Sequence, residues 1–204
     1  MGGIVVPDKK NEHFMNRLTP IVVVAAALLL HACKPSAPVV FRGLPKEYNL
    51  AYEELYGRCY DSVTHAVAAL DLYSEGLELD KNHRMTGSGY NLYLSDIFLP
   101  DRTGSDSLRM AAGTYRSDTT AEPFTFLPGR DYEGMPHGMY LLHIEDGKVT
   151  GIQVLDSGYV TLRDTTDGMT DLRFTLYYRN TYGSRATYEP HFMGPLIPWR
   201  KYTR

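Results

Sequence analysis

Histidines are the side chains in this sequence best suited to metal binding or proton transfer, but their spacing does not form a metal site. The five that follow the N-terminal segment are dispersed, with no pair at helical i, i+4 spacing: His65, His83, His137, His143 and His191. His143 and Glu145 alternate on one face of a predicted strand, yet they supply two ligands where a zinc site uses three or four. We therefore expect no metal and no cofactor.

Carboxylates, hydroxyls and thiols form no recognisable catalytic motif either. No Gly-x-Ser-x-Gly nucleophile elbow is present, and the segment Thr86–Tyr90, TGSGY, reads as a turn entering a strand. Asp96, Asp101 and Asp106 lack the twelve-residue loop pattern and terminal glutamate of a calcium site. Cys59 has no base nearby in the sequence, which favours a small buried side chain. The sequence predicts a protein that is not an enzyme.

Aromatic residues are the stronger functional signal. Four tyrosines gather near one predicted hairpin, and further aromatics surround the long Gly-rich connection PFTFLPGRDYEGMPHGMY, residues 123–140. Loops of this kind on a rigid β-scaffold often carry binding function, although alternating tyrosines in strands can simply cover a core. We expect a site at a cavity or barrel mouth for a small apolar or carbohydrate ligand, formed by Tyr132, His143, Tyr177 and Tyr178.

Composition limits the class of protein. Hydrophobic residues make up 43% of the 204 residues and charged residues 22%, which is typical of a globular domain. The net charge of -3 and the pI of about 6.2 give no basic surface for nucleic acid. The 16 tyrosines, 18 glycines and 12 prolines favour short strands joined by tight turns.

The N-terminal segment predicts export and a lipid anchor. Residues 15–32 carry a basic residue followed by an apolar run of about ten residues, too short to span a bilayer as a helix. The following Leu30-His31-Ala32-Cys33 resembles the lipobox of bacterial lipoproteins, in which the cysteine is lipidated. Residues 1–14 make a poor start for a signal, so we expect translation to begin at Met15. Residues 33–46 would then be the lipidated cysteine and a Pro-containing tether.

Residues 47–204 are expected to form a single β-domain. Residues 47–60 show a loose helical pattern, which predicts one short helix or an irregular lead-in. From Ser62 onward the apolar period falls to two, and Asp146-Gly147 between two alternating runs predicts a hairpin. Asp96 interrupts one such run. About eight to ten strands at short spacing predict an antiparallel up-and-down barrel or, as a close second, a β-sandwich.

The order of several segments resembles a known family. GTYRSDTTAEPFTFLPG, DGKVTGIQVLDSGYVTLRD and DLRFTLYYRNTYGSRATYEPHFMGPL follow one another as in Bacteroides-type bacterial lipoproteins with a calycin-like or lipocalin-like domain. The resemblance runs from about Tyr56 to Leu196, and its glycines are structural. It implies an all-β extracytoplasmic domain of the outer membrane and names no catalyst. Lys34-Pro35-Ser36 lacks the acidic run that resembles surface-export signals, which favours the periplasmic face.

Two functional interpretations remain open from the sequence. The first is a membrane-anchored, non-catalytic binding module. The second is a structural or interaction subunit of an envelope or surface complex without a small-molecule ligand. An enclosed cavity lined by apolar and aromatic side chains would favour the first, and a filled interior with an exposed apolar patch would favour the second.

Overall fold

The computed structural model describes residues 41, 43–57, 65–100 and 109–201. Contacts within the chain separate Met1–Pro38 from Val39–Arg204, and every described residue belongs to the second unit. In this part the chain is all-β, and no described helix is long and apolar enough to cross a membrane. The all-β prediction is confirmed.

The described strands are mostly short, and the longest two have ten residues. They are β1 (Glu47–Tyr48), β2 (Leu50–Gly57), β3 (Val67–Tyr73), β4 (Leu77–Leu79), β5 (Met85–Gly87), β6 (Gly89–Phe98), β7 (Gly113–Ser117), β8 (Thr125–Phe126), β9 (Arg130–Tyr132), β10 (Met135–His137), β11 (Met139–Glu145), β12 (Lys148–Val154), β13 (Ser157–Asp164), β14 (Thr170–Arg179), β15 (Arg185–Tyr188), β16 (His191–Gly194) and β17 (Ile197–Lys201).

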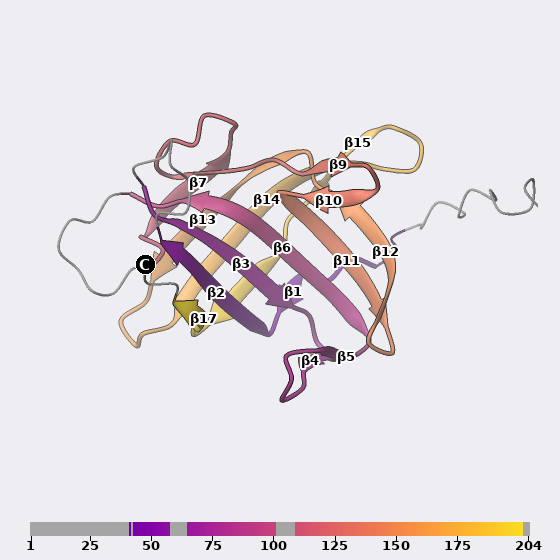
Figure 1. Cartoon of the computed structure of the whole chain (residues 1–204), viewed down its shortest axis with the longest axis horizontal. Coiled ribbons are helices and arrows are strands. Elements are labelled where there is room, and N and C mark those ends of the chain that lie inside the picture. The colour runs from indigo at the N-terminus through magenta and orange to yellow at the C-terminus, as the bar shows by residue number, and fades with distance from the viewer. Residues whose placement is uncertain (1–40, 42, 58–64, 101–108, 202–204) are drawn as a thin grey trace, which may run out of the picture. The chain divides into compact units, whose positions relative to one another are not determined.

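One curled sheet forms the body of the domain. Its main path runs β1-β16-β14-β13-β7-β8-β6-β3-β2-β17, while β11 and β12 extend it beside β6 and β15 extends it beside β14. The pairs β1–β16, β2–β17 and β7–β8 are parallel, and the other pairs are antiparallel. Because only Asn49 separates β1 from β2, the path nearly returns to its start. In Figure 1, β2, β3, β6 and β11 form the near wall, and β13 and β14 pass behind them.

Inward-facing side chains fill the space that the curled sheet encloses. Alternate residues of each strand point inward and form one contiguous buried cluster that draws on both walls. Its largest fully buried members include Tyr115, Phe126 and Phe192, together with leucines from β3, β6 and β11. Large apolar side chains therefore occupy the interior, as in small barrels whose lumen is packed rather than open.

The expectation of a helix or irregular lead-in over residues 47–60 is wrong for the described part, Glu47–Gly57, which forms β1 and β2. Ala51, Glu53 and Leu55 are buried on the inner face of β2. Tyr52 and Tyr56 on the outer face are themselves half-buried. Burial on both faces places apolar residues at odd and even positions, which hides the period of two.

The local turn signals are confirmed. Asp146 and Gly147 both have positive φ, 50° and 72°, and join β11 to β12 as the twist of a two-residue hairpin requires. Asp96 also has positive φ, 52°, and the pairing of β3 with β6 shifts register beside it. That irregularity allows Leu94 and Ile97 both to face the interior.

The outer face of the near wall carries a second, smaller apolar cluster. Tyr73, Leu142 and Ile144 pack there with Leu77, which belongs to the β4–β5 hairpin. The hairpin projects from the lower edge of the wall in Figure 1. Within the described residues, the hairpin packs against only part of this face.

Candidate functional site

A groove lies beneath the β9–β10 hairpin, within the Gly-rich connection that the sequence singles out. The hairpin turn has Glu133 and Gly134 at φ 52° and 81°, and the Asp131 Oδ1 accepts a hydrogen bond from the Gly134 N–H at 2.9 Å. Tyr132 pairs with Met135, and Arg130 pairs with His137. This register presents the polar side chains of a very short hairpin at the protein surface.

Two glycines attach the hairpin to the main sheet. The Gly129 N–H donates to the Leu155 carbonyl at 2.8 Å, and a Cβ at Gly129 would lie 2.0 Å from the Met139 carbonyl oxygen. Gly138 has φ +74°, and its carbonyl accepts from the Ser95 N–H at 3.0 Å. Only glycine permits these close backbone approaches, so the position of the hairpin relative to β6 is defined.

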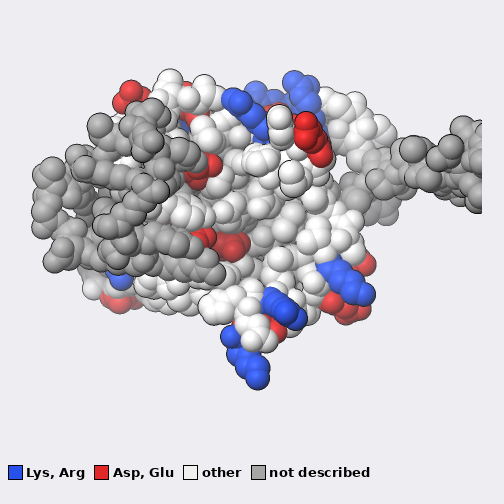
Figure 2. Space-filling model, viewed as in Figure 1, with Lys and Arg blue, Asp and Glu red and all other residues white. Residues whose placement is uncertain are grey.

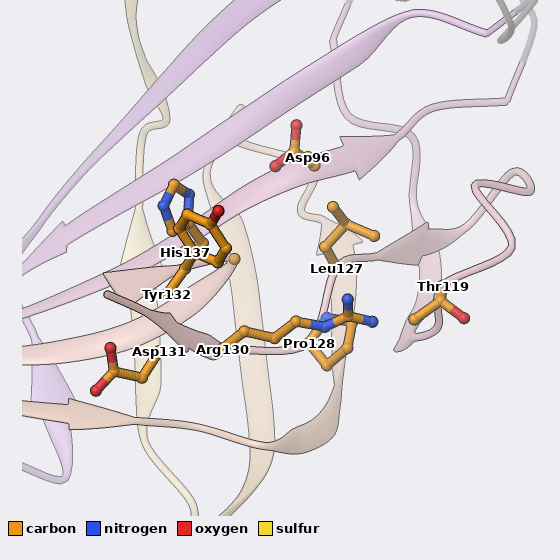
Figure 3. A pocket seen from close by; sticks show the side chains of 9 residues that line it. Asp96, Thr119, Leu127, Pro128, Arg130, Asp131, Tyr132 and His137 are labelled. Atoms are coloured by element: carbon orange, nitrogen blue, oxygen red, sulfur yellow. The ribbon is translucent and has the colours of Figure 1, made fainter. Parts of the chain in front are cut away.

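The groove has a volume of about 530 Å³, which lies within the usual range of about 300–1,000 Å³ for small-molecule sites. It is bounded by the hairpin, by the β6 irregularity and by the segment after β7. Figure 3 shows Asp96 on one side and the rings of Tyr132 and His137 beside one another on the hairpin. The lining residues are Asp96, Thr119, Leu127, Pro128, Arg130, Asp131, Tyr132, His137 and Gly138.

The groove combines an exposed aromatic ring with charged and hydrogen-bonding groups. The Tyr132 side chain is 62% exposed, and its ring meets the His137 ring edge to face at 6.1 Å between centroids. Arg130 is exposed and forms no ion pair with a described residue. The Asp96 carboxylate accepts a hydrogen bond from the Ser95 hydroxyl at 2.8 Å. Such a surface can stack against a planar or cyclic ligand and hydrogen-bond its polar groups.

The structure does not bring the four sequence-predicted binding residues together. Tyr132 lines the groove. His143 stacks on Tyr90 at 4.9 Å between centroids, on the inner face of β11. Tyr178 packs against the interior cluster, whereas the Tyr177 ring lies on the other face of β14 with the Arg185 guanidinium 4.0 Å from its centroid.

Two of the described histidines, His143 and His191, form side-chain hydrogen bonds with other described residues. His143 contacts the Thr150 hydroxyl through Nδ1 at 3.0 Å and lies 4.0 Å from Glu145. Within the described residues, no three His, Cys, Asp or Glu side chains are arranged to hold a metal ion. Cys59 and the loop carboxylates Asp101 and Asp106 lie outside the described residues.

His191 joins three strands at the closure of the sheet. Its Nδ1 lies 2.9 Å from Glu47 of β1, and its Nε2 lies 2.9 Å from Asp171 of β14. Burial alone would raise the pKa of the Asp171 carboxyl, but hydrogen bonds from Arg173 and His191 outweigh it and lower that pKa. Because β1 and β16 pair over only two residues, this bridge supports the closure.

A second hollow of about 160 Å³, which we call the outer pocket, lies on the outer face of the near wall. It is lined by Tyr52, Glu54, Ala69, Asp71, Tyr93 and Trp199, which come from β2, β3, β6 and β17. Burial raises the pKa of the Asp71 carboxyl to about 6, although hydrogen bonds from Tyr73 and Asn91 oppose the rise and the Glu54 charge adds to it. Sequence reasoning missed this site because its residues are far apart along the chain and follow no motif.

The lining side chains define the chemistry of the groove and of the outer pocket. The strand pairing defines the fold. No protein-family model, curated protein or solved structure matches the chain.

Proposed function

We propose that this chain is a non-catalytic binding protein of the bacterial cell envelope whose groove under the β9–β10 hairpin binds a carbohydrate. The observation that carries the proposal is the groove itself, with about 530 Å³ of space and an exposed tyrosine ring beside charged side chains. Anchoring through lipid on Cys33 at the outer membrane, with the periplasmic face favoured, is part of the proposal.

The side chains of the groove favour a carbohydrate over an apolar ligand. A sugar ring presents an apolar face of C–H groups, which can lie on an aromatic ring, and hydroxyls at its rim, which need donors and acceptors. Tyr132 supplies the ring, and Asp96 and Arg130 supply an acceptor and a set of donors. An open polar groove removes little of the apolar surface of a long fatty acid or of haem from water, whereas it suits a ligand that stays partly hydrated.

The filled interior supports the same choice. A lipocalin-like carrier of apolar ligands needs an enclosed lumen, but leucines and aromatic side chains from both walls occupy this one. The binding site that we propose therefore lies outside the sheet.

Replacing Tyr132 by alanine tests the groove directly. We expect the dissociation constant for a bound oligosaccharide to rise about tenfold or more, because losing about 1.4 kcal/mol of stacking is a tenfold change in affinity. Tyr182→Ala is the matched control, since Tyr182 is 90% exposed on the β14–β15 turn and does not line the groove. Ligands would first be found on a glycan array and then titrated by calorimetry. Equal affinities of the two variants would contradict the proposal.

The anchor is tested by Cys33→Ala, at a residue outside the described part of the chain. We expect the variant to lose incorporation of labelled fatty acid and to leave the membrane fraction, because the acyl chains supply the membrane affinity. The measurement is fractionation with acyl labelling in cells expressing the full chain. A variant that stays in the membrane with its label would remove the anchor from the proposal.

A second candidate function is that of an interaction subunit of an envelope complex. The observation that favours it is β12, which pairs only with β11 among the described strands and exposes Val149 and Ile152. A free strand edge with apolar side chains can accept a strand from a partner protein. Charged substitutions at these two residues would then disrupt a pull-down from membranes while leaving glycan binding unchanged.

A further inference from the structure

The outer pocket has aromatic walls on several sides. The Tyr52 and Trp199 rings meet at 5.0 Å between centroids with an interplanar angle of 67°, so they form a corner rather than a stack. Tyr93 lies on the opposite strand, and its ring in turn contacts Tyr140 at 5.1 Å. Ala69 forms the floor, and its small side chain leaves the space of about 160 Å³ open.

The carboxylates of Glu54 and Asp71 lie among these aromatic rings and form no ion pair with a described side chain. The Tyr56 hydroxyl donates to Glu54 Oε2 at 2.9 Å, and the Tyr73 hydroxyl donates to Asp71 Oδ2 at 2.5 Å. The Asn91 amide donates to the other Asp71 oxygen. All three donors are neutral, and among the lysines and arginines whose side chains the structure describes, none forms an ion pair with either carboxylate. Figure 2 shows acidic side chains near the middle of the described surface, with lysine and arginine side chains at its upper and lower edges.

A carboxylate that is partly removed from water and surrounded by aromatic rings costs free energy unless a cation binds beside it. Aromatic faces attract cations through their negative π surface, and the attraction grows when the site excludes water. Carboxylates that are held by neutral hydrogen bonds keep their net charge and add to that attraction. From these contacts we propose that the outer pocket binds a quaternary ammonium group.

The geometry distinguishes this ligand from a metal ion and from a simple ammonium. A divalent metal requires several oxygen ligands that replace its water shell, whereas here tyrosine and asparagine donors already occupy carboxylate oxygens. A quaternary ammonium carries no N–H and therefore needs no acceptors, only charge and apolar contact with its methyl groups. Tyr52, Tyr93 and Trp199 provide that contact. The site is separate from the carbohydrate groove and does not depend on it.

Trp199 is the only tryptophan in the chain, so its fluorescence reports directly on this pocket. We expect choline and tetramethylammonium to produce a saturable change in the fluorescence of the full chain. The neutral isostere of choline, 3,3-dimethyl-1-butanol, has the same shape without the charge and should produce no saturable change at equal concentration. An equal response to the neutral compound, or no saturable response to either cation, would overturn the proposal.

Two variants test the pocket by different means. Ala69→Leu fills the floor without changing charge and should abolish the saturable response. Glu54→Gln keeps the shape and removes one charge, and it should weaken binding about tenfold. Tyr132→Ala, in the carbohydrate groove, should bind choline as the wild type does. Wild-type affinity in both Ala69→Leu and Glu54→Gln would overturn the proposal even if choline binds elsewhere.

The quaternary ammonium group of choline occurs both in the free solute and in the headgroup of phosphatidylcholine. Co-sedimentation with phosphatidylcholine vesicles, compared with phosphatidylglycerol vesicles, distinguishes these sources. Retention on phosphatidylcholine alone, lost in the Ala69→Leu variant, assigns the headgroup. Saturable binding of choline without retention on either vesicle assigns the free compound.

Discussion

Replacing Phe126 by alanine is expected to lower the free energy of unfolding by about 3–5 kcal/mol, as measured by urea unfolding of the full chain. Phe126 is fully buried in the interior cluster. Truncation removes its apolar contacts and leaves a cavity that the rigid strands around it cannot close.

The position of Phe126 adds to the effect. Its short strand β8 pairs antiparallel with Ile97 of β6 and parallel with Ser117 of β7, so it joins the near wall to the far wall. The control is Tyr182→Ala at an exposed position, which should change the free energy of unfolding by less than about 0.5 kcal/mol. Similar small changes in both variants would mean that the interior is not packed as described.

The second large effect concerns Asp71 and pH. Burial raises the pKa of this carboxyl from 3.8 in the unfolded chain to about 6 in the folded protein. The folded state therefore holds the proton more tightly, and the stability that this group contributes is fully present below pH 3.8 and is lost as pH rises through 6. From 1.36 kcal/mol for each pKa unit, the loss is about 3 kcal/mol.

We expect Asp71→Asn to remove this pH dependence. The free energy of unfolding of the variant, relative to the wild type, should rise by about 2–2.5 kcal/mol between pH 4 and pH 7. Asp80→Asn provides a control of opposite sign, because backbone hydrogen bonds from Arg84 and Asn82 lower the pKa of Asp80. Parallel profiles for wild type and Asp71→Asn would show that Asp71 does not titrate with a raised pKa.

Local features of the fold were predictable because their causes are local. Asp146-Gly147 allows the positive φ values that a two-residue hairpin demands, and the alternating runs on both sides supply its strands. Asp96 interrupts the pattern of β6 and indeed adopts positive φ. Glu47–Gly57 forms strands although its sequence predicts a helix or an irregular lead-in. Both faces of β2 are covered, so the apolar period does not distinguish its inner face from its outer face.

Long-range pairings could not be derived in the same way. The parallel pairs of β1 with β16 and of β2 with β17 join the two ends of the domain, and no short stretch of sequence encodes their register. Trp199 reaches the outer pocket through the β17–β2 pairing, so the sequence alone does not indicate a site at Glu54 and Asp71.

The candidate groove was predictable in part. The Gly-rich connection and Tyr132 were identified as binding elements, and the structure places them at the groove. Arg130 and His137 lie in the same connection, but the sequence does not distinguish them, because their alignment across the hairpin depends on the Glu133-Gly134 turn. Tyr177 and Tyr178, adjacent in sequence, point to opposite faces of β14 and therefore cannot share a site.

The central claim is that a carbohydrate binds in the groove outside a filled, curled sheet. Its most direct test is amide chemical-shift mapping by NMR of the protein titrated with an oligosaccharide identified on the array. We predict the largest shift changes at Arg130–Gly138 and around Asp96 and Thr119, with the interior strand amides unchanged. Largest changes among the interior residues of β6, β11 and β14, or no change with any oligosaccharide tested, would contradict the account.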